Sequence, residues 1–271
     1  MHVTDDELVN FDAHGAAPLA KPKDEGFVEN DGARIWYATY GSGPAVMLLH
    51  GGLGNAGNWG YQVPALVASG RQAVVIDSRG HGRSTRDERP FHYAQMAEDA
   101  LAVIDHLDLA RTALVGWSDG ACTALILADR RPDRVSGVFF LACNMDPNGT
   151  LEFKPTPVID RCFSRHRKDY QALSATPDAF DSFVSDVSQM MQTEPNYTAA
   201  DLAGIKVPVA VVLGEKDEFI KREHADYLAR TIPDAELILI PEVSHFAPLQ
   251  RPEHFNREVL GFLDRLEHFM F

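Results

Sequence analysis

The residue best suited to chemistry is Ser118, in the sequence Gly116-Trp117-Ser118-Asp119-Gly120. The apolar run 112–115 before it is typical of a strand, and the run 121–128 after it is typical of a helix. A serine on a tight turn between a strand and a helix has an exposed hydroxyl and a strained backbone. Glycines two residues before and after the serine leave room for neighbouring backbone. The pattern predicts a nucleophile beside helix N–H groups that favour negative charge.

Two more side chains suited to proton transfer follow strand-like runs later in the chain. Asp217 lies just beyond the apolar run 207–213, and His245 lies just beyond the run 237–240. A serine hydroxyl is a weak nucleophile at neutral pH and needs a neighbouring base. His245 can take the proton of Ser118 and return it to a leaving group, while Asp217 orients the imidazole and stabilises its charged form. The three residue types predict a Ser-His-Asp triad.

The elements that must position these residues alternate between strands and helices. The predicted strands are 27–30, 34–40, 45–49, 73–76, 112–115, 137–142, 207–213 and 237–240, and the predicted helices are 61–69, 92–107, 121–129, 221–231 and 252–269. The first two strands flank an Asn-Asp-Gly turn and form a hairpin. The later alternation predicts an α/β fold with a doubly wound, mostly parallel sheet. Ligands of such sheets bind beyond the carboxyl ends of the strands, where the three residues stand.

The segment from about residue 145 to residue 203 does not continue this alternation of strands and helices. It has no strong strand, it contains helix-like runs at 161–173 and 179–192, and five prolines interrupt it. A segment this long in a compact domain is normally functional. We expect residues 145–203 to form an inserted helical cap, residues 26–144 and 204–271 to form the α/β core, and residues 1–25 to form an N-terminal arm or loop.

Composition excludes several classes of function. The net charge of 25 − 39 = −14 argues against nucleic acid and anionic membranes as partners. Three cysteines without a pattern predict no disulfide framework, and no cluster of ligand residues predicts a metal or cofactor. No apolar run is long enough to span a membrane, and the acidic first twelve residues lack the features of a signal peptide. We expect a cytoplasmic protein that acts on a small molecule, and the oligomeric state stays open.

Five motifs follow one another in an order that carries a resemblance. They are His50-Gly51-Gly52, the run from Asp77 to Ser84, the turn around Ser118, Gly214-Glu215-Lys216-Asp217 and Ser244-His245-Phe246. From about residue 27 onward the chain resembles the α/β-hydrolase fold family, in the branch with a helical cap. The resemblance implies an oxyanion hole formed by the backbone N–H groups of Gly52 and Asp119. It is specific for the fold and much less so for the substrate.

Other acidic residues are alternative candidates for the acid of the triad. Glu215 and Glu218 flank Asp217, and Asp146 follows the preceding strand, where some members of the family carry the acid. Asp217 is favoured because Gly-x-x-Asp is the commoner arrangement in the family. Because position 118 is a serine, the aspartate-nucleophile branches of this fold, dehalogenases and epoxide hydrolases, are disfavoured. His50, His81 and Arg83 are interpreted as structural residues, not bases.

Asp119 is the residue that bears most on substrate choice. The sequence Gly-Trp-Ser-Asp-Gly resembles that of valacyclovir-hydrolase-like serine esterases, in which this aspartate pairs with the α-amino group of amino-acid esters. The alternative is that Asp119 only complements the helix dipole. Trp59 and Phe246 are the aromatic residues that we expect near the substrate.

These observations predict a serine hydrolase that cleaves a small carboxylic ester or lactone through an acyl-enzyme, with a preference for α-amino acid esters as a hypothesis. The same fold also hosts C–C bond hydrolases, amidases and cofactor-free perhydrolases, and the fold does not decide among them. A third class stays open, a ligand receptor that keeps the triad with vestigial hydrolase activity.

Overall fold

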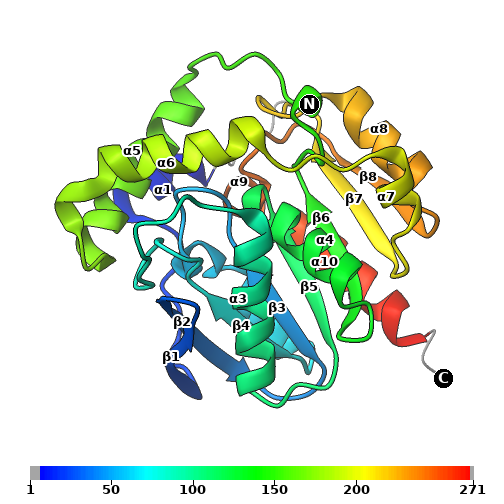
Figure 1. The fold of residues 1–271 in the computed structure, drawn as a ribbon, viewed down its shortest axis with the longest axis horizontal. Coiled ribbons are helices and arrows are strands. Elements are labelled where there is room, and N and C mark those ends of the chain that lie inside the picture. The colour runs from blue at the N-terminus through cyan, green and yellow to red at the C-terminus, as the bar shows by residue number, and fades with distance from the viewer. Residues whose placement is uncertain (1–6, 269–271) are drawn as a thin grey trace.

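A computed structural model describes residues 7–268, and its centre is one eight-stranded sheet (Figure 1). The strands are β1 Asp24–Asn30, β2 Ala33–Gly41, β3 Ala45–Leu49, β4 Gln72–Ile76, β5 Thr112–Trp117, β6 Val135–Leu141, β7 Val209–Gly214 and β8 Ala235–Ile240. Their spatial order is β1-β2-β4-β3-β5-β6-β7-β8. The pairs β1–β2 and β2–β4 are antiparallel, and the five later pairs are parallel. The predicted leading hairpin and mostly parallel sheet are confirmed.

The central parallel strands β3, β5, β6 and β7 are mostly apolar, as expected where helices cover both faces of the sheet. Every residue of β5 and of β7 is buried. The strands at the two edges of the sheet, β1 and β8, instead consist mostly of exposed and half-buried residues. This contrast explains why uninterrupted apolar runs predicted the parallel strands.

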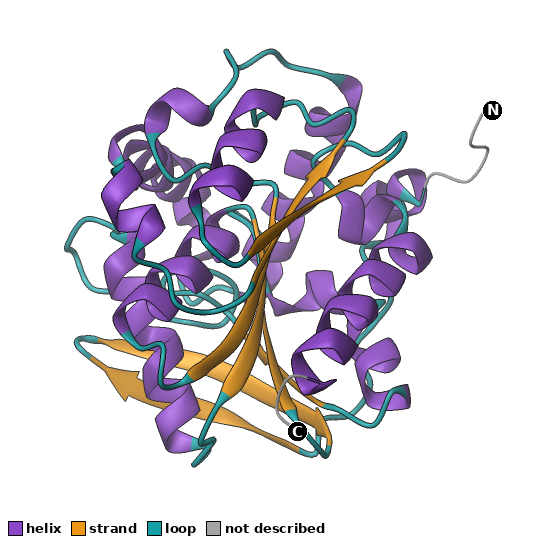
Figure 2. Cartoon of the chain, turned by 90° about the vertical axis from the view of Figure 1, so that its right-hand side faces the viewer, coloured by secondary structure: helices purple, strands orange, loops and turns teal. Residues whose placement is uncertain are grey.

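The helices lie on both faces of the sheet and above it (Figure 1). They are α1 Leu8–His14, α2 Gln62–Ala68, α3 Tyr93–His106, α4 Asp119–Arg130, α5 Pro157–Leu173, α6 Phe180–Thr193, α7 Ala199–Ala203, α8 Arg222–Thr231, α9 Ala247–Gln250 and α10 Pro252–His268, with 3-10 turns η1 Ala56–Trp59, η2 Pro147–Gly149 and η3 Pro177–Ala179. α3 packs on α4 at the front in Figure 1, and α10 packs against α2 and β6 behind the sheet. Figure 2 shows the twisted sheet between the helices on its two faces. None of the helices within residues 7–268 is both long and apolar enough to cross a bilayer.

The N-terminal segment differs from the predicted arm or loop, because residues 8–14 form α1. Leu8 and Phe11 are buried, and the Phe11 ring meets the His166 ring of α5 edge-on, with centroids 5.8 Å apart. A helix of two turns is too short for a 3.6-residue apolar repeat to stand out in the sequence. Packing on α5 stabilises it instead. Residues 1–6 of the predicted arm and residue 269 of the predicted closing helix lie outside the described residues.

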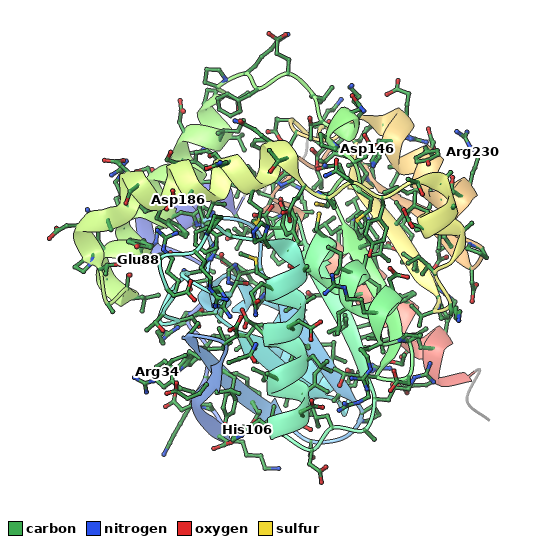
Figure 3. All side chains as sticks on the ribbon, viewed as in Figure 1. Arg34, Glu88, His106, Asp146, Asp186 and Arg230 are labelled. Atoms are coloured by element: carbon green, nitrogen blue, oxygen red, sulfur yellow. The ribbon has the colours of Figure 1, made fainter. Side chains whose placement is uncertain are left out.

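The insertion between β6 and β7 is mostly helical and lies above the sheet in the view of Figure 1. α5 begins at Pro157, earlier than the predicted residue 161, because Thr156 caps it. The Thr156 hydroxyl oxygen accepts the Ile159 N–H at 3.2 Å, and a proline is favoured in the first turn. Arg86 and Asp186 pair at 2.6 Å, which ties α6 to the loop before α3 that also carries Glu88 (Figure 3). The cap boundaries at 145 and 203 stay a prediction.

Candidate active site

Ser118 is the single residue between the last residue of β5 and the first residue of α4. Its backbone has φ 53° and ψ −124°, outside the regions that a serine normally occupies. A Cβ added to Gly116 would lie 2.4 Å from the Gly120 carbonyl oxygen, and one added to Gly120 would lie 2.0 Å from the Leu49 carbonyl oxygen. Both positions therefore require glycine, because backbone already fills the space that a side chain would need.

The ring of His245 is held by Asp217. His245 Nδ1 lies 2.9 Å from Asp217 Oδ2. The other oxygen, Oδ1, accepts the backbone N–H groups of Phe219 at 2.9 Å and Ile220 at 2.8 Å. Because both of its oxygens are bonded, the carboxylate has a fixed orientation. It selects the imidazole tautomer that carries its proton on Nδ1 and a lone pair on Nε2.

The surroundings of His245 make it a stronger base. Burial alone lowers the pKa of the ring, but the charge of Asp217, its hydrogen bond, and the charges of Glu218 and Asp119 together raise the pKa above 6.5. The backbone is fixed as well, since Trp117 Nε1 donates to the His245 carbonyl oxygen at 2.9 Å. This arrangement holds a proton on His245 up to a higher pH than a free imidazole would.

The alternative acids have other partners. Glu218 Oε2 accepts the backbone N–H of His245 at 3.0 Å and not a ring nitrogen. Glu215 accepts a backbone N–H of the neighbouring turn at 3.1 Å, and Asp146 accepts one inside η2 at 2.8 Å. Of the four candidate acids, Asp217 is the one whose carboxylate is bonded to the His245 ring.

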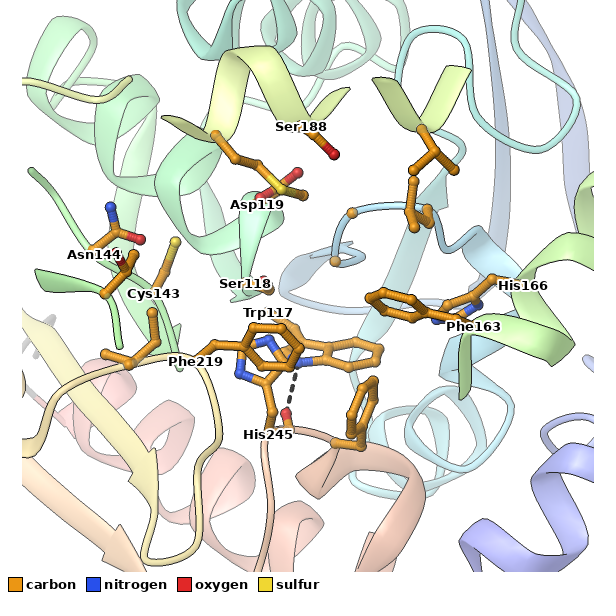
Figure 4. A pocket seen from close by; sticks show the side chains of 18 of the residues that line it. Trp117, Ser118, Asp119, Cys143, Asn144, Phe163, His166, Ser188, Phe219 and His245 are labelled. Atoms are coloured by element: carbon orange, nitrogen blue, oxygen red, sulfur yellow. Dashed lines mark hydrogen bonds between the residues drawn. The ribbon is translucent and has the colours of Figure 1, made fainter. Parts of the chain in front are cut away.

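One cavity of about 170 Å³ is lined by Ser118, His245, Gly52 and Asp119 (Figure 4). Its walls are mostly apolar and come from the sheet side and from α5 and α6, and they include Trp117, Phe246, Phe163, Val184 and Met191. Within residues 7–268, no three His, Cys, Asp or Glu side chains are grouped as ligands for a metal ion. The cavity therefore offers a nucleophile, a base and one carboxylate in apolar surroundings.

The Asp119 carboxylate is buried at the cavity wall and is only half bonded. Its Oδ1 accepts the Tyr93 hydroxyl at 2.8 Å, whereas its buried Oδ2 has no hydrogen-bond partner among the residues that the structure describes. Burial raises the pKa of Asp119 to about 6, against the lowering effects of the Tyr93 bond and of His245. A buried carboxylate oxygen without a donor is unfavourable. This oxygen therefore keeps a hydrogen-bonding capacity that the described residues do not use.

Gly52 lies against the same carboxylate. A Cβ at this position would lie 2.6 Å from Asp119 Oδ2 and 2.4 Å from Met191 Cε, so a larger residue would displace one of them. Asp119 is the first residue of α4, and its backbone N–H therefore has no acceptor within the helix. Both residues line the cavity that holds Ser118. An oxyanion hole formed by the backbone N–H groups of Gly52 and Asp119 would have to lie in this cavity, close to Ser118.

The two aromatic residues expected near the substrate lie in different places. Phe246 lines the cavity. Trp59 is fully buried in the core, where its ring meets the Trp117 ring edge-on at 6.3 Å and stacks on Phe255 at 6.4 Å. Trp117 forms the cavity wall in its place. The prediction that Trp59 contacts substrate is corrected accordingly: the apolar environment that suggested a pocket is the hydrophobic core.

The motif residues interpreted as structural have contacts that fit this role. His50 Nε2 accepts the Ser78 N–H at 2.9 Å. Arg83 bonds to Asp77 Oδ2 through its backbone N–H at 2.8 Å and through its side chain at 3.0 Å. The residues that line the cavity do not include His50, His81 or Arg83. These groups stabilise the loops around the cavity.

Sequence reasoning missed six polar or aromatic residues of the cavity, namely Tyr93, Asn144, Thr150, His166, Ser188 and Phe219. The Phe219 ring lies 4.6 Å from the His245 ring, and its place two residues after Asp217 was an available signal. Tyr93 and Ser188 have no local signal, because only the fold brings α3 and α6 to the cavity.

Comparisons with known proteins agree with this fold. The family described as alpha/beta hydrolase fold matches residues 44–193, more than half of the chain. The serine hydrolase BPHL of Mus musculus is 29% identical over 244 residues, which cover 86% of this chain and 84% of that protein. The solved structure of Est816, described as an N-acyl homoserine lactone degrading enzyme, is 29% identical with a TM-score of 0.70 and covers 88% of this chain and 100% of that chain. The meta-cleavage product hydrolase CumD of Pseudomonas fluorescens IP01 has a TM-score of 0.77 at 20% identity, over 89% of this chain and 97% of that one.

The family match includes the strand, turn and helix around Ser118. The mostly parallel eight-stranded sheet with its antiparallel start, and the mouse relative that covers most of the chain, extend the similarity beyond this segment. The chain belongs to the α/β-hydrolase fold family.

Proposed function

We propose that this protein is a serine hydrolase that cleaves a small carboxylic ester or lactone through an acyl-enzyme. The observation that carries the proposal is the cavity shared by Ser118, on its strained turn, and His245, whose ring is bonded to Asp217 at 2.9 Å. Each of these features is common by itself. Their combination supplies a nucleophile, a base and an orienting acid at one place.

In the proposed reaction, His245 Nε2 takes the proton of Ser118 Oγ as this oxygen attacks the ester carbonyl carbon. Asp217 stabilises the imidazolium that forms, and the N–H groups of Gly52 and Asp119 donate to the oxyanion. His245 then protonates the departing alkoxide. Water, activated by the same ring, attacks the acyl-enzyme, and the acid and the free serine are restored.

We further propose that residues 145–203 act as a cap on a core formed by residues 26–144 and 204–271. α5 and α6 contribute Phe163, Val184 and Met191 to the cavity, so part of the substrate pocket depends on this segment. A covering of this kind limits the access of water to the reacting ester. The small volume and apolar walls favour a compact, mostly apolar acyl group.

The unpartnered oxygen of Asp119 supports a narrower proposal, a preference for esters of α-amino acids. A protonated α-amino group would supply the donor and the positive charge that Oδ2 lacks. Near pH 7 the two charges coexist, because the pKa of Asp119 is about 6 and free α-amino groups keep their proton up to about pH 7.7.

Active-site labelling tests the proposed nucleophile. A fluorophosphonate probe is expected to label Ser118 in the wild-type protein, with the modified peptide identified by mass spectrometry, and to leave the Ser118→Ala variant unlabelled. Ser188 lies in the same cavity and provides the matched control, since Ser188→Ala should label like the wild type. Labelling of another residue would contradict the assignment.

A substrate panel tests the bond that is cleaved. It contains esters, lactones, amides and vinylogous diketones, and the Est816 relative makes N-acyl homoserine lactones the first lactones to include. Turnover of esters or lactones supports the proposal. Turnover confined to amides or to C–C bonds would replace it, and tight binding of one ligand without turnover would favour a receptor.

A further inference from the structure

Tyr93, the first residue of α3, reaches the cavity from outside the predicted motifs. Its hydroxyl donates to Asp119 Oδ1 at 2.8 Å, its side chain is buried, and it lines the cavity that holds Ser118. One oxygen of the Asp119 carboxylate is thus occupied by a hydrogen bond within the protein. The other, Oδ2, has no partner among residues 7–268 and is buried against Gly52 in the cavity wall.

The Tyr93 hydroxyl is a donor throughout the neutral range. Burial raises the pKa of Tyr93 well above 10, and the charge of Asp119 and the nearby thiols of Cys122 and Cys143 raise it further. Donation to the carboxylate favours the ionised form of Asp119, as does His245, and both effects oppose the effect of burial. Removal of the hydroxyl would leave the Asp119 charge with less support.

Tyr93 is anchored in turn by Glu194, the residue that follows α6. The Tyr93 backbone N–H donates to Glu194 Oε2 at 3.2 Å, and Glu194 Oε1 lies 2.5 Å from His92 Nδ1. The hydroxyl therefore has a set position between α3 and α4. Rotation of the Asp119 carboxylate would break its bond to Tyr93. In the observed orientation Oδ2 lies against Gly52, beside the proposed oxyanion hole.

We propose that Tyr93 is a positioning residue for substrate selection: its hydroxyl holds Asp119 ionised and turned so that Oδ2 meets the ammonium group of an α-amino ester. The inference rests on the proposed function and names a determinant of its specificity. An ammonium group has three donors, so one can reach Oδ2 while Oδ1 stays bonded to Tyr93. Tyr93 acts through Asp119, and its loss should change which ester is preferred.

The Tyr93→Phe variant tests this role with an α-amino ester and its deaminated analogue. At pH 7 we expect kcat/KM for the amino ester to fall about 10-fold, mainly through KM, as for the loss of one hydrogen bond to a charged group. The kcat/KM for the deaminated analogue should fall less, because that ester brings no ammonium group to Asp119, and the ratio of the two values is the readout. The acid limb of the amino-ester profile should also move to higher pH, since Asp119 would hold its proton more tightly. A purely structural role would change both esters together.

Tyr197→Phe is the matched control. The Tyr197 hydroxyl also donates to an aspartate, Asp129 Oδ2, at the same distance of 2.8 Å, but Tyr197 does not line the cavity. If the wild type prefers the amino ester and Tyr93→Phe keeps that preference as Tyr197→Phe does, the inference is overturned. Should Tyr93→Phe fail to fold, the double variant with Asp119→Asn removes the buried charge. It should select like Asp119→Asn alone, and a different selectivity would overturn the inference.

A direct titration of Asp119 distinguishes failure of the α-amino ester proposal from failure of the role given to Tyr93. If the wild type shows no preference for the amino ester, that proposal fails by itself. Carbon-13 NMR of the Asp119 carboxyl in the wild type and in Tyr93→Phe then decides the role of the hydroxyl. A higher midpoint in the variant supports the part of the inference in which the Tyr93 hydroxyl holds Asp119 ionised, and an unchanged midpoint overturns that part.

Discussion

Two aspartates have buried side chains at or beside the cavity, Asp119 in its wall and Asp217 behind His245, and they are bonded in different ways. Asp217 uses both oxygens, one on the His245 ring at 2.9 Å and the other on two backbone N–H groups. Asp119 uses one oxygen, on the Tyr93 hydroxyl at 2.8 Å, and the other has no partner among the described residues. Burial accordingly raises the pKa of Asp119 to about 6.

This difference in hydrogen bonding distinguishes the two carboxylates. Both oxygens of Asp217 are bonded within the protein, whereas Oδ2 of Asp119 can still accept a hydrogen bond from a ligand. Asp77 is another fully bonded example outside the cavity: it accepts the Ala56 N–H at 2.7 Å on one oxygen and two bonds from Arg83 on the other. An unbonded buried oxygen destabilises the folded state, and such costs are typical of functional sites. The comparison supports the proposal that Asp217 acts on His245 and that Asp119 acts on the substrate.

The largest effect is expected from removal of Ser118, on which the roles of both aspartates depend. Ser118→Ala should lower turnover of p-nitrophenyl acetate by about 10⁴-fold or more and should do so for every ester alike. The fold should stay intact, because only a hydroxyl is lost. Initial rates and circular dichroism measure the two outcomes, and unchanged turnover would refute Ser118 as the nucleophile.

The next effect separates the aspartates. Asp217→Asn should lower kcat by roughly 10³–10⁴-fold, because the amide no longer selects the reactive tautomer of His245. The loss should be equal for an α-amino ester and its deaminated analogue, since Asp217 acts only through the ring. Steady-state kinetics on the two esters measure this. A change in their relative kcat/KM would mean that Asp217 also contacts the substrate amine, and the distinction between the two carboxylates would be lost.

The pH dependence sharpens the same distinction. Both esters should lose kcat/KM as the pH falls through the pKa of His245, which lies above 6.5. The amino ester alone should lose more as Asp119 gains its proton at about pH 6. Its preference should also fall above about pH 7.7, where α-amino groups lose their charge. The ratio of the two kcat/KM values is therefore expected to give a bell-shaped pH profile. A ratio that stays constant on the acid side would show that the Asp119 charge does not contribute to the preference for the amino ester.

The smallest effect is on stability. The pKa of Asp119 is about 6 in the folded state against 3.8 unfolded, so the folded state holds the proton more tightly and loses stability as the pH rises between these values. Asp119→Asn should therefore raise the free energy of unfolding by about 1–3 kcal/mol at pH 8, with little gain near pH 4. Urea unfolding at the two pH values measures this, with Asp217→Asn as the destabilised control. A loss of stability in Asp119→Asn at pH 8 would indicate that the protein already satisfies Oδ2.

Much of the fold could be predicted because its signals are local. β3 was expected at 45–49 and is Ala45–Leu49, since a strand buried on both faces is a continuous apolar run. Glycines 116 and 120 also signalled the turn at Ser118, because neighbouring backbone leaves no room for a Cβ at either position. Asp217 and His245 were found by their place after the last two strands.

The remaining features depend on contacts between distant segments. α1 forms against α5, and Tyr93 reaches Asp119 only because α3 packs on α4. Trp59 was misplaced because an aromatic residue of the core and one of a pocket look alike in sequence. The half-bonded state of Asp119 is likewise a property of the packed structure, although its position beside Ser118 directed attention to it.

The ratio of kcat/KM for an α-amino ester to that for its deaminated analogue, measured at pH 7, tests the central claim most directly. One hydrogen bond between charged groups predicts a ratio of about 10–100 in the wild type. The ratio should fall to about 1 in Asp119→Asn, which keeps the triad. A ratio near 1 in a wild-type enzyme that hydrolyses both esters would contradict the account.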